Sequence, residues 1–201
     1  RSLIKKGYGN KELNGELIFE NRKNLNLLDS SAVASWFEIK KPSVVILAAA
    51  KVGGIGANSS YPADFFLENI KIQTNVIESA YKSGVKRLLF LGSSCIYPKN
   101  ANQPIIEEEL LKGALEPTNE FYAIAKISGI ELCEALRKQY GFNAISLMPT
   151  NLYGPGDNYD EFNSHVLASF IRRFCKAKLE KAEIVTCWGT GTPRREFLYV
   201  E

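Results

Sequence analysis

Four side chains near the middle of the sequence have the types and spacing to act on a carbonyl group. Ser93 and Cys95 lie two residues apart in the string LGSSCIYP, residues 91–98, directly after an apolar segment typical of a buried parallel strand. Ligands of open α/β sheets bind beyond the carboxyl ends of the strands, so these side chains are expected at a crevice. If the chain stays extended there, the hydroxyl and the thiol point to the same side.

Tyr122 and Lys126 form the second pair, in the string YAIAK. A separation of four residues is one helical turn, which places the phenol and the ammonium on a common face. The ammonium would stabilise the phenolate and lower the pKa of the tyrosine. A packed tyrosine and a solvated lysine often share this spacing by chance. The position of the pair at a helix start, after a strand that ends in Gly-Ser-Ser, favours proton transfer to a carbonyl that Ser93 also contacts.

Cys95 and His165 have both a structural and a catalytic interpretation. A free cysteine is commonly a small buried hydrophobic residue, and a lone histidine commonly lies in a loop or at a helix start. A thiol beside Ser93 together with the only histidine of the sequence could instead remove and return protons. Four arginines could likewise hold phosphates or simply cover the surface: Arg172, Arg173, Arg194 and Arg195.

The elements that must position these residues alternate regularly. The patterns predict strands over residues 15–20, 43–50, 85–91 and 143–148, and helices over 30–39 with Asp29 as N-cap, 62–84 and 120–140. This order predicts an α/β fold, a doubly wound parallel Rossmann-type sheet with helices on both faces. After Pro149 a turn-rich segment, a helix over 165–177 and a strand over 183–188 indicate the start of a smaller substrate-binding domain. We therefore predict domains at 1–149 and 150–201.

The start of the sequence lacks two parts of such a sheet. Residues 2–9 are typical of a helix end closed by glycine, and the first strand and glycine-rich turn of a doubly wound domain do not precede them. We therefore infer a fragment that has lost its first βα turn, and we expect it to bind a dinucleotide poorly and to show no turnover alone. The string KVGGIGAN, residues 51–58, matches neither G-x-G-x-x-G nor the P-loop and is interpreted as a flexible turn beside the crevice. Residues 99–119 are interpreted as an active-site flap.

Composition narrows the class of protein. The 201 residues are 45% hydrophobic and 23% charged with a net charge of +3, and no basic stripe interleaves with aromatic residues, so we predict no nucleic-acid partner. The longest apolar run, residues 44–50, is far shorter than the roughly 20 residues of a membrane span. Four scattered cysteines and one histidine predict neither a disulfide framework nor a metal site. Because no signal segment opens the sequence, we predict reduced thiols in the cytoplasm.

The sequence resembles the GDP-L-fucose synthases, a group of extended short-chain dehydrogenase/reductases, from about residue 26 to its end. The strings that carry the resemblance are AAAKVGGI at 48–55, LGSSCIYP at 91–98, EPTN at 116–119, YAIAK at 122–126, MPTNLYGP at 148–155, NSH at 163–165, and WGTGTP at 188–193 with REF at 195–197. The resemblance implies conversion of GDP-4-dehydro-6-deoxy-D-mannose to GDP-L-fucose by 3,5-epimerisation and 4-keto reduction with NADP(H).

The resemblance also implies roles for matching residues. Tyr122 would donate a proton to the C4 oxygen, Ser93 would orient that carbonyl, Lys126 would bind the nicotinamide ribose, and Cys95 and His165 would epimerise C3 and C5. The residues implied to hold the GDP-sugar are Arg173, Trp188 and Arg195. The residues implied to line the cofactor are Arg22, Lys23, Asn24, Leu25, Asn26, Leu27, Leu91, Gly92, Ser93, Ser94, Lys126, Pro149, Thr150, Asn151, Leu152 and His165.

Several alternatives stay open from the residues alone. Glu20, after the strand at 15–20, favours NAD, whereas Arg22 and Lys23 favour the 2′-phosphate of NADP. A 4-epimerase or 4,6-dehydratase of the same fold would share Ser93, Tyr122 and Lys126 without needing the Cys95–His165 pair. A non-catalytic cofactor-binding module is a further possibility. The helices at 62–84 and 120–140 could form the interface of a homodimer, which is compatible with catalysis.

Overall fold

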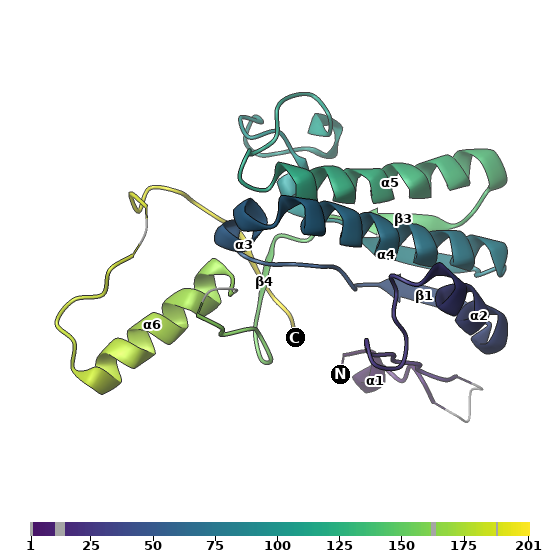
Figure 1. Ribbon diagram of the computed structural model, residues 1–201, viewed down its shortest axis with the longest axis horizontal. Coiled ribbons are helices and arrows are strands. Elements are labelled where there is room, and N and C mark those ends of the chain that lie inside the picture. Colours follow the sequence, from purple (N-terminus) through teal and green to yellow (C-terminus); the bar gives the residue numbers. More distant parts are fainter. Residues whose placement is uncertain (1, 11–14, 162–163, 188) are drawn as a thin grey trace.

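The structure is a computed structural model that describes residues 2–10, 15–161, 164–187 and 189–201 (Figure 1). Its elements, in chain order, are α1 (Ser2–Lys5), α2 (Ser30–Lys40), β1 (Val44–Leu47), α3 (Ile55–Ser60), α4 (Pro62–Lys82), β2 (Arg87–Leu91), η2 (Ser94–Ile96), η3 (Glu107–Glu109), α5 (Glu120–Tyr140), β3 (Ala144–Leu147), β4 (Asn151–Tyr153), α6 (Val166–Glu180) and β5 (Phe197–Tyr199).

A three-stranded parallel sheet in the order β1-β2-β3 forms the centre of the fold. Val45 pairs with Leu88, and Leu88 pairs with Ala144. The three parallel strands are therefore aligned and have their carboxyl ends at the same edge of the sheet. The connections between them contain α4 and α5, two helices of 21 residues each. The predicted α/β fold with a parallel sheet is thereby confirmed.

The helices begin and end where their capping residues predict. Asp29 accepts a hydrogen bond from the Ala32 amide at 3.0 Å, which satisfies a free donor of the first turn of α2. Pro62 occupies the first turn of α4, where its missing N–H costs nothing. Gly141 follows α5 with φ of +69°, a left-handed conformation that glycine adopts easily. The predicted N-cap and both long helices are confirmed.

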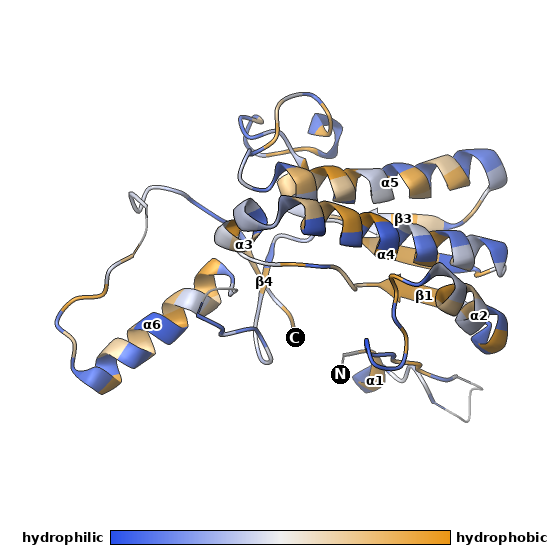
Figure 2. Ribbon diagram, viewed as in Figure 1, coloured by the Kyte–Doolittle hydropathy of each residue, from blue (hydrophilic) through white to orange (hydrophobic). Residues whose placement is uncertain are grey.

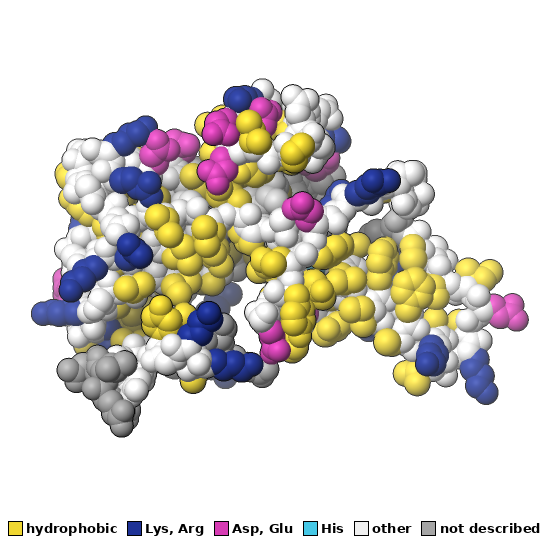
Figure 3. Space-filling model, turned by 180° about the vertical axis from the view of Figure 1, so that it is seen from behind, with side chains coloured by type: hydrophobic (Ala, Val, Ile, Leu, Met, Phe, Trp, Pro, Cys, Tyr) yellow, Lys and Arg dark blue, Asp and Glu magenta, His cyan; other side chains and the backbone are white. Residues whose placement is uncertain are grey.

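One face of the sheet is covered and the other is not. α2, α4 and α5 lie side by side (Figure 1), and their apolar stripes, orange in Figure 2, meet the fully buried Leu88, Phe90 and Ala144. On the opposite face, Val44 is 57% exposed and Leu147 is 48% exposed. Seen from behind, hydrophobic side chains gather over this part of the molecule (Figure 3). The expectations that residues 43–50 are buried on both faces and that helices cover both faces were wrong for the described residues.

Two of the predicted strands are not formed. Residues 15–20 have no regular secondary structure and Phe19 is 70% exposed, because a strand needs a neighbouring strand for its backbone hydrogen bonds and none lies beside this segment among the described residues. Residues 183–187 are also irregular, and Ile184 is 80% exposed. A strand that the sequence patterns did not predict, β5, pairs in parallel with β4 instead.

Candidate active site

Ser93 and Cys95 lie at the carboxyl end of β2, as predicted, but through a different local geometry. Ser93 is extended, with φ of −160°, and the chain then enters the 3₁₀ turn η2, which contains Cys95. The turn brings the Cys95 Sγ within 3.2 Å of the Ser93 Oγ. The hydroxyl and the thiol therefore converge because the chain turns, and the expectation of an extended chain was wrong.

Tyr122 reaches the same place from the first turn of α5. Its ring packs edge-to-face against Phe65 of α4, with ring centroids 6.3 Å apart. The phenol interacts with the Ser93 hydroxyl and with the charge of Cys95, which places all three side chains in one cluster. The structure thus brings together groups from the end of β2 and the start of α5.

Lys126 completes the cluster one turn further along α5. Its side chain is only 4% exposed, its Nζ donates to the Leu91 carbonyl at 2.8 Å, and the ammonium lies 4.8 Å from the centroid of the Phe90 ring. The carbonyl and the ring face are both electronegative, so they partly compensate the ammonium for lost hydration. Lys126 is therefore held at the carboxyl end of β2.

Burial dominates the electrostatics of the cluster. It raises the pKa of Tyr122 to about 12, with the charge of Cys95 adding to the rise and the hydrogen bond with Ser93 opposing it. It also lowers the pKa of Lys126 to about 8, against the opposing effect of Cys95. The pKa of the Cys95 thiol is raised by burial, although Ser93 and Lys126 pull it down. The prediction that the ammonium lowers the pKa of Tyr122 was therefore wrong for this structure.

Two buried amides hold the loop that follows β1. Asn69 of α4 accepts a hydrogen bond from the Lys51 amide at 2.9 Å and donates to the Lys51 carbonyl at 3.0 Å. Asn58 of α3 donates to the carbonyls of Gly53 and Gly54, at 2.9 and 3.1 Å. Side chains thus bind the backbone of this glycine-rich segment. Residues 55–58, interpreted as part of a turn, instead form the start of α3.

The Lys51 side chain also has partners in this loop. Its Nζ lies 2.5 Å from a carboxylate oxygen of Glu68 and 3.5 Å from one of Asp64, both on α4. The hydrogen bond that Lys51 donates to Glu68 is the main reason that the pKa of Lys51 is raised. Sequence reasoning missed this network. The signal was available as polar residues, Asn69 and Gln73, at helical spacing on the face of α4 that packs inward.

His165 precedes α6 as its N-cap residue. Its side chain is exposed, and its carbonyl accepts the Ser169 amide at 2.8 Å to start the helix. The preceding residue, Ser164, approaches the loop after β1, because a Cβ added to Gly54 would lie 3.4 Å from the Ser164 carbonyl oxygen. The convergence of His165 with Cys95 on one substrate stays a prediction.

Apart from Lys126 and His165, described above, the predicted cofactor-lining residues fall in three places. Residues 22–27 form a turn in which the Asn21 side chain accepts the Lys23 amide at 2.9 Å, and Arg22 and Lys23 are exposed. Leu25 packs into the hydrophobic core. Leu91, Gly92, Ser93 and Ser94 follow along the end of β2, and the Gly92 amide donates to the Leu147 carbonyl at 2.8 Å. Pro149, Thr150, Asn151 and Leu152 lead into β4.

The predicted substrate-binding arginines belong to the C-terminal part. Arg173 donates to the Thr186 carbonyl at 3.2 Å, and the exposed Arg195 donates to the Arg194 carbonyl at 2.8 Å. Arg172 pairs with Glu161 at 2.9 Å. Trp188 lies outside the described residues. The segment predicted as a flap, residues 99–119, is closed at its base by an ion pair between Lys99 and Glu116 at 2.9 Å.

The described residues contain no group of three or more His, Cys, Asp or Glu side chains arranged to hold a metal ion. None of the helices in the described part of the chain has the length and apolar character needed to cross a bilayer.

A strand end carrying a serine, with a tyrosine and a lysine one helical turn apart beside it, can polarise a carbonyl and deliver a proton. Residues 3–201 match the NAD dependent epimerase/dehydratase family. The chain belongs to that family. Within it, the chain is 58% identical over all 201 residues to GDP-L-fucose synthase 1 of Arabidopsis thaliana and 57% identical over 186 residues to GDP-L-fucose synthase of Escherichia coli.

Solved structures from this family are similar as well. A GDP-D-glycero-L-gluco-heptose synthase from Campylobacter jejuni, solved with NADPH, has a TM-score of 0.87 at 35% identity and covers 98% of this chain and 65% of its own. A GDP-L-fucose synthetase from Naegleria fowleri bound to NADP has a TM-score of 0.83 at 32% identity. The match covers 98% of this chain and 63% of that structure's chain. The match to the Arabidopsis relative includes 100% of this chain and 60% of the relative's length. The match to the E. coli relative includes 92% of this chain and 58% of the relative's length.

Proposed function

We propose that the complete protein is a bifunctional nucleotide-sugar epimerase and reductase that converts GDP-4-dehydro-6-deoxy-D-mannose to GDP-L-fucose. The observation that carries the proposal is the 3.2 Å contact between the Cys95 thiol and the Ser93 hydroxyl, in the cluster that also contains Tyr122. A reductase alone needs the hydroxyl and the phenol, whereas a thiol at the same carbonyl offers acid–base chemistry at the neighbouring carbons. Relatives at 55–58% identity named GDP-L-fucose synthase support the substrate.

The residues present fit NADP(H) as the cofactor. Lys126 has a buried ammonium beside the carboxyl end of β2, where it could hold the ribose next to the nicotinamide. Exposed Arg22 and Lys23 could bind a 2′-phosphate, which favours NADP over NAD. The backbone at residues 91–94 and 149–152, together with His165, would line the remainder. When bound, NADPH supplies the hydride for C4.

In the reduction, the residues of the cluster transfer one proton to the substrate. Tyr122 donates the proton of its hydroxyl to the C4 oxygen, so that the ketone becomes an alcohol as the hydride reaches carbon. Ser93 donates a hydrogen bond to the same oxygen and orients it. Lys126, whose ammonium donates to the Leu91 carbonyl, binds the nicotinamide ribose beside the reacting carbonyl. Because burial keeps the pKa of Tyr122 at about 12 in this structure, the phenol is protonated and ready to donate at neutral pH.

In the epimerisation, Cys95 and His165 move protons at C3 and C5. The C4 ketone acidifies both positions, because removal of either proton gives an enolate whose charge rests on the C4 oxygen. Ser93 and Tyr122 stabilise that oxygen by hydrogen bonds. One of the two groups takes the proton from carbon, and the other returns a proton to the opposite face, so each inversion leaves the substrate with the same atoms and charge.

The remaining roles complete the proposal. Arg173, Trp188 and Arg195 hold the GDP part of the substrate, and residues 150–201 belong to a substrate-binding domain distinct from residues 1–149. The protein works in the cytoplasm as a homodimer through α4 and α5. Exposed apolar side chains on these helices support that interface, with Leu67 52% and Phe121 50% exposed.

The experiment is to supply the complete protein with GDP-4-dehydro-6-deoxy-D-mannose and NADPH in heavy water. The proposal expects deuterium at both C3 and C5 and reduction at C4, read by NMR and mass spectrometry of the product. A 4-epimerase or a 4,6-dehydratase of the same fold would not reduce this ketone with label at both carbons. Binding of NADPH without any turnover would instead indicate a cofactor-binding module.

A further inference from the structure

Helix α4 presents two buried amide side chains to its neighbours. Asn69 and Gln73 lie one turn apart, and they are 2% and 3% exposed. Asn69 binds the backbone of the loop after β1. Gln73 binds the other neighbour, because its Nε2 donates to the Ala125 carbonyl of α5 at 2.5 Å. None of the proposed catalytic steps uses this second contact.

Helix α5 has the space that the Gln73 side chain needs. A Cβ added to Gly129, one turn beyond Ala125, would lie 2.9 Å from Gln73 Cδ and 2.5 Å from Phe90 Cζ. Glycine at this position therefore leaves room for both side chains. An oxygen in place of Gln73 Nε2 would meet the Ala125 carbonyl oxygen, so the nitrogen must be the donor. The contact is directional and selects one position along α5.

Stability alone does not require an amide at this position. Gln73 Oε1 is buried and has no hydrogen-bond partner among the described residues. A buried acceptor without a partner costs free energy, which offsets the gain from the single bond to Ala125. An apolar side chain of similar length would avoid that cost. Buried polar groups that add little stability can fix the register of packed helices, because apolar contacts are not directional.

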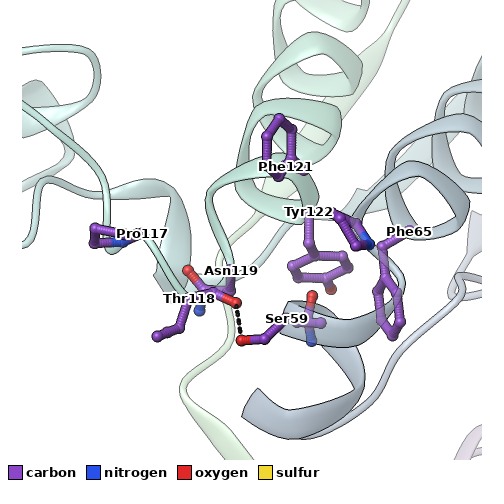
Figure 4. A pocket seen from close by; sticks show the side chains of 9 residues that line it. Ser59, Phe65, Pro117, Thr118, Asn119, Phe121 and Tyr122 are labelled. Atoms are coloured by element: carbon purple, nitrogen blue, oxygen red, sulfur yellow. Dashed lines mark hydrogen bonds between the residues drawn. The ribbon is translucent and has the colours of Figure 1, made fainter.

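The first turn of α5, which contains Tyr122, is weakly anchored by its own surroundings. Asn119 precedes the helix, but its side chain makes no capping hydrogen bond with the described residues. The Tyr122 ring packs against Phe65, and a cavity of about 170 Å³ opens beside the two rings, where α3, α4 and the chain that enters α5 meet (Figure 4). Packing on this side therefore leaves room for the turn to shift along α4.

We propose that Gln73 is a positioning residue that sets the register of α5 on α4 and thereby places the phenol of Tyr122. The inference rests on the proposed function, which makes that phenol the proton donor. Tyr122 lies three residues before Ala125, about 5 Å along the helix axis, so a slide of α5 moves the phenol by the same amount. A misplacement of about 1 Å can lower a rate by about 10²-fold. The Lys126 ammonium has a flexible stem, so it can follow such a slide and keep its bond to the Leu91 carbonyl.

The test replaces Gln73 by methionine, which has a similar length but no donor, in the complete protein. Gln73→Met should lower the single-turnover rate of C4 reduction, measured with an already epimerised 4-ketone and saturating NADPH, by about 10- to 100-fold. The dissociation constant of NADPH should change by less than about twofold, because Lys126 adjusts. The urea midpoint should be unchanged or higher. Gln139→Met, the same change at an exposed position of α5, is the matched control and should alter none of these values.

A double variant tests whether Gln73 acts through Tyr122. The proton donor is already absent in Tyr122→Phe, so adding Gln73→Met should change the residual rate of reduction by less than about twofold. If the two effects multiply instead, Gln73 acts through another group and the inference is wrong.

The remaining outcomes separate this inference from the proposed function. If the native protein reduces the ketone and Gln73→Met does so at the same rate, the inference is wrong and the proposed function stands. If the urea midpoint falls together with the rate, Gln73 is a structural residue and the inference is also wrong. Should Gln73→Met not fold, Gln73→Leu is measured in the same way, and failure of both variants to fold contradicts the inference. If the native protein does not reduce the ketone, the proposed function fails and the inference fails with it.

Discussion

The three-stranded sheet with α2, α4 and α5 differs from residues 150–201 in where its apolar side chains lie. In the first region, Leu88, Phe90 and Ile77 are fully buried between sheet and helices. In the second, Leu179 is 84% exposed and Ile184 is 80% exposed, and hydrophobic side chains cover the visible face of α6 (Figure 3). Both regions contribute predicted site residues, but only the first holds them by packing.

The difference separates two kinds of functional residue. Ser93, Cys95, Tyr122 and Lys126 contact one another or share partners, because the end of β2 and the start of α5 are fixed by a buried core. His165 and Arg195 lie on segments whose side chains are largely exposed. Under the proposed function, the groups assigned to reduction are therefore fixed by the sheet region, whereas groups assigned to nucleotide binding lie on exposed segments.

The largest expected effect is on the chemical step. Tyr122→Phe removes the proton donor while keeping the ring that packs against Phe65. The rate of C4 reduction should fall by about 10³-fold, within the range for loss of a general acid, with little change in the denaturation midpoint. Single-turnover NADPH oxidation measures this. A fall below tenfold would mean that another group donates the proton.

The packing of the two regions can be compared by the same substitution in each. Leu88→Ala in the sheet, at 0% exposure, should lower the free energy of unfolding by roughly 2–5 kcal/mol, because it removes buried methyl groups and leaves a cavity. Leu179→Ala on α6 should change it by no more than about 0.5 kcal/mol. Urea denaturation of the two variants measures both values. Equal losses would show that α6 is buried as deeply as the sheet and would remove the contrast.

The contact between α5 and β2 gives the next effect. A Cβ on Gly129 would lie 2.5 Å from Phe90 Cζ, so Gly129→Ala must move the ring that lies under the Lys126 ammonium. We expect a loss of about 1–3 kcal/mol of stability, together with slower reduction. Gly56→Ala in α3 is the matched control, since no atom lies within 4 Å of its added Cβ, and it should be neutral or slightly stabilising. The idea fails if both variants unfold at the same urea concentration.

The smallest effect is a dependence of stability on pH. Burial lowers the pKa of Lys126 to about 8, whereas an unfolded lysine titrates at about 10.4, so between these values the unfolded chain binds the extra proton and stability rises with pH. Lys126→Met should remove roughly 1–2 kcal/mol of that rise between pH 8 and 9.5. Above about pH 10 the raised pKa of Tyr122 acts in the opposite sense. Parallel pH profiles for the native protein and Lys126→Met would contradict the assignment.

Sequence patterns predicted the sheet region far better than what surrounds it. The apolar strands and the spacing of Tyr122 and Lys126 are local signals, and the parallel topology brings their ends together, so the Ser93–Cys95–Tyr122–Lys126 cluster could be anticipated. The partner of Asn69 could not be anticipated in the same way: polar spacing along α4 marks the residue, but its hydrogen bonds to Lys51 join the loop after β1 to a helix by tertiary contact.

Failed predictions have the same physical origin. Residues 15–20 have the composition of a strand, but a strand forms only where a neighbour supplies hydrogen bonds. The pKa of Tyr122 depends on how completely the phenol is buried, which spacing along a helix does not reveal. Local patterns predict elements, whereas burial and pairing depend on what other segments cover them.

The most direct measurement of the central claim compares two steps in Cys95→Ala. The complete variant protein is given GDP-4-dehydro-6-deoxy-D-mannose in heavy water, and separately an already epimerised 4-ketone with NADPH. If the thiol and the phenol divide the chemistry at one ketone, deuterium exchange at C3 and C5 falls by 10² or more, while the rate of hydride transfer changes by less than about tenfold. Equal loss of both activities, or exchange that survives without the thiol, would contradict the account.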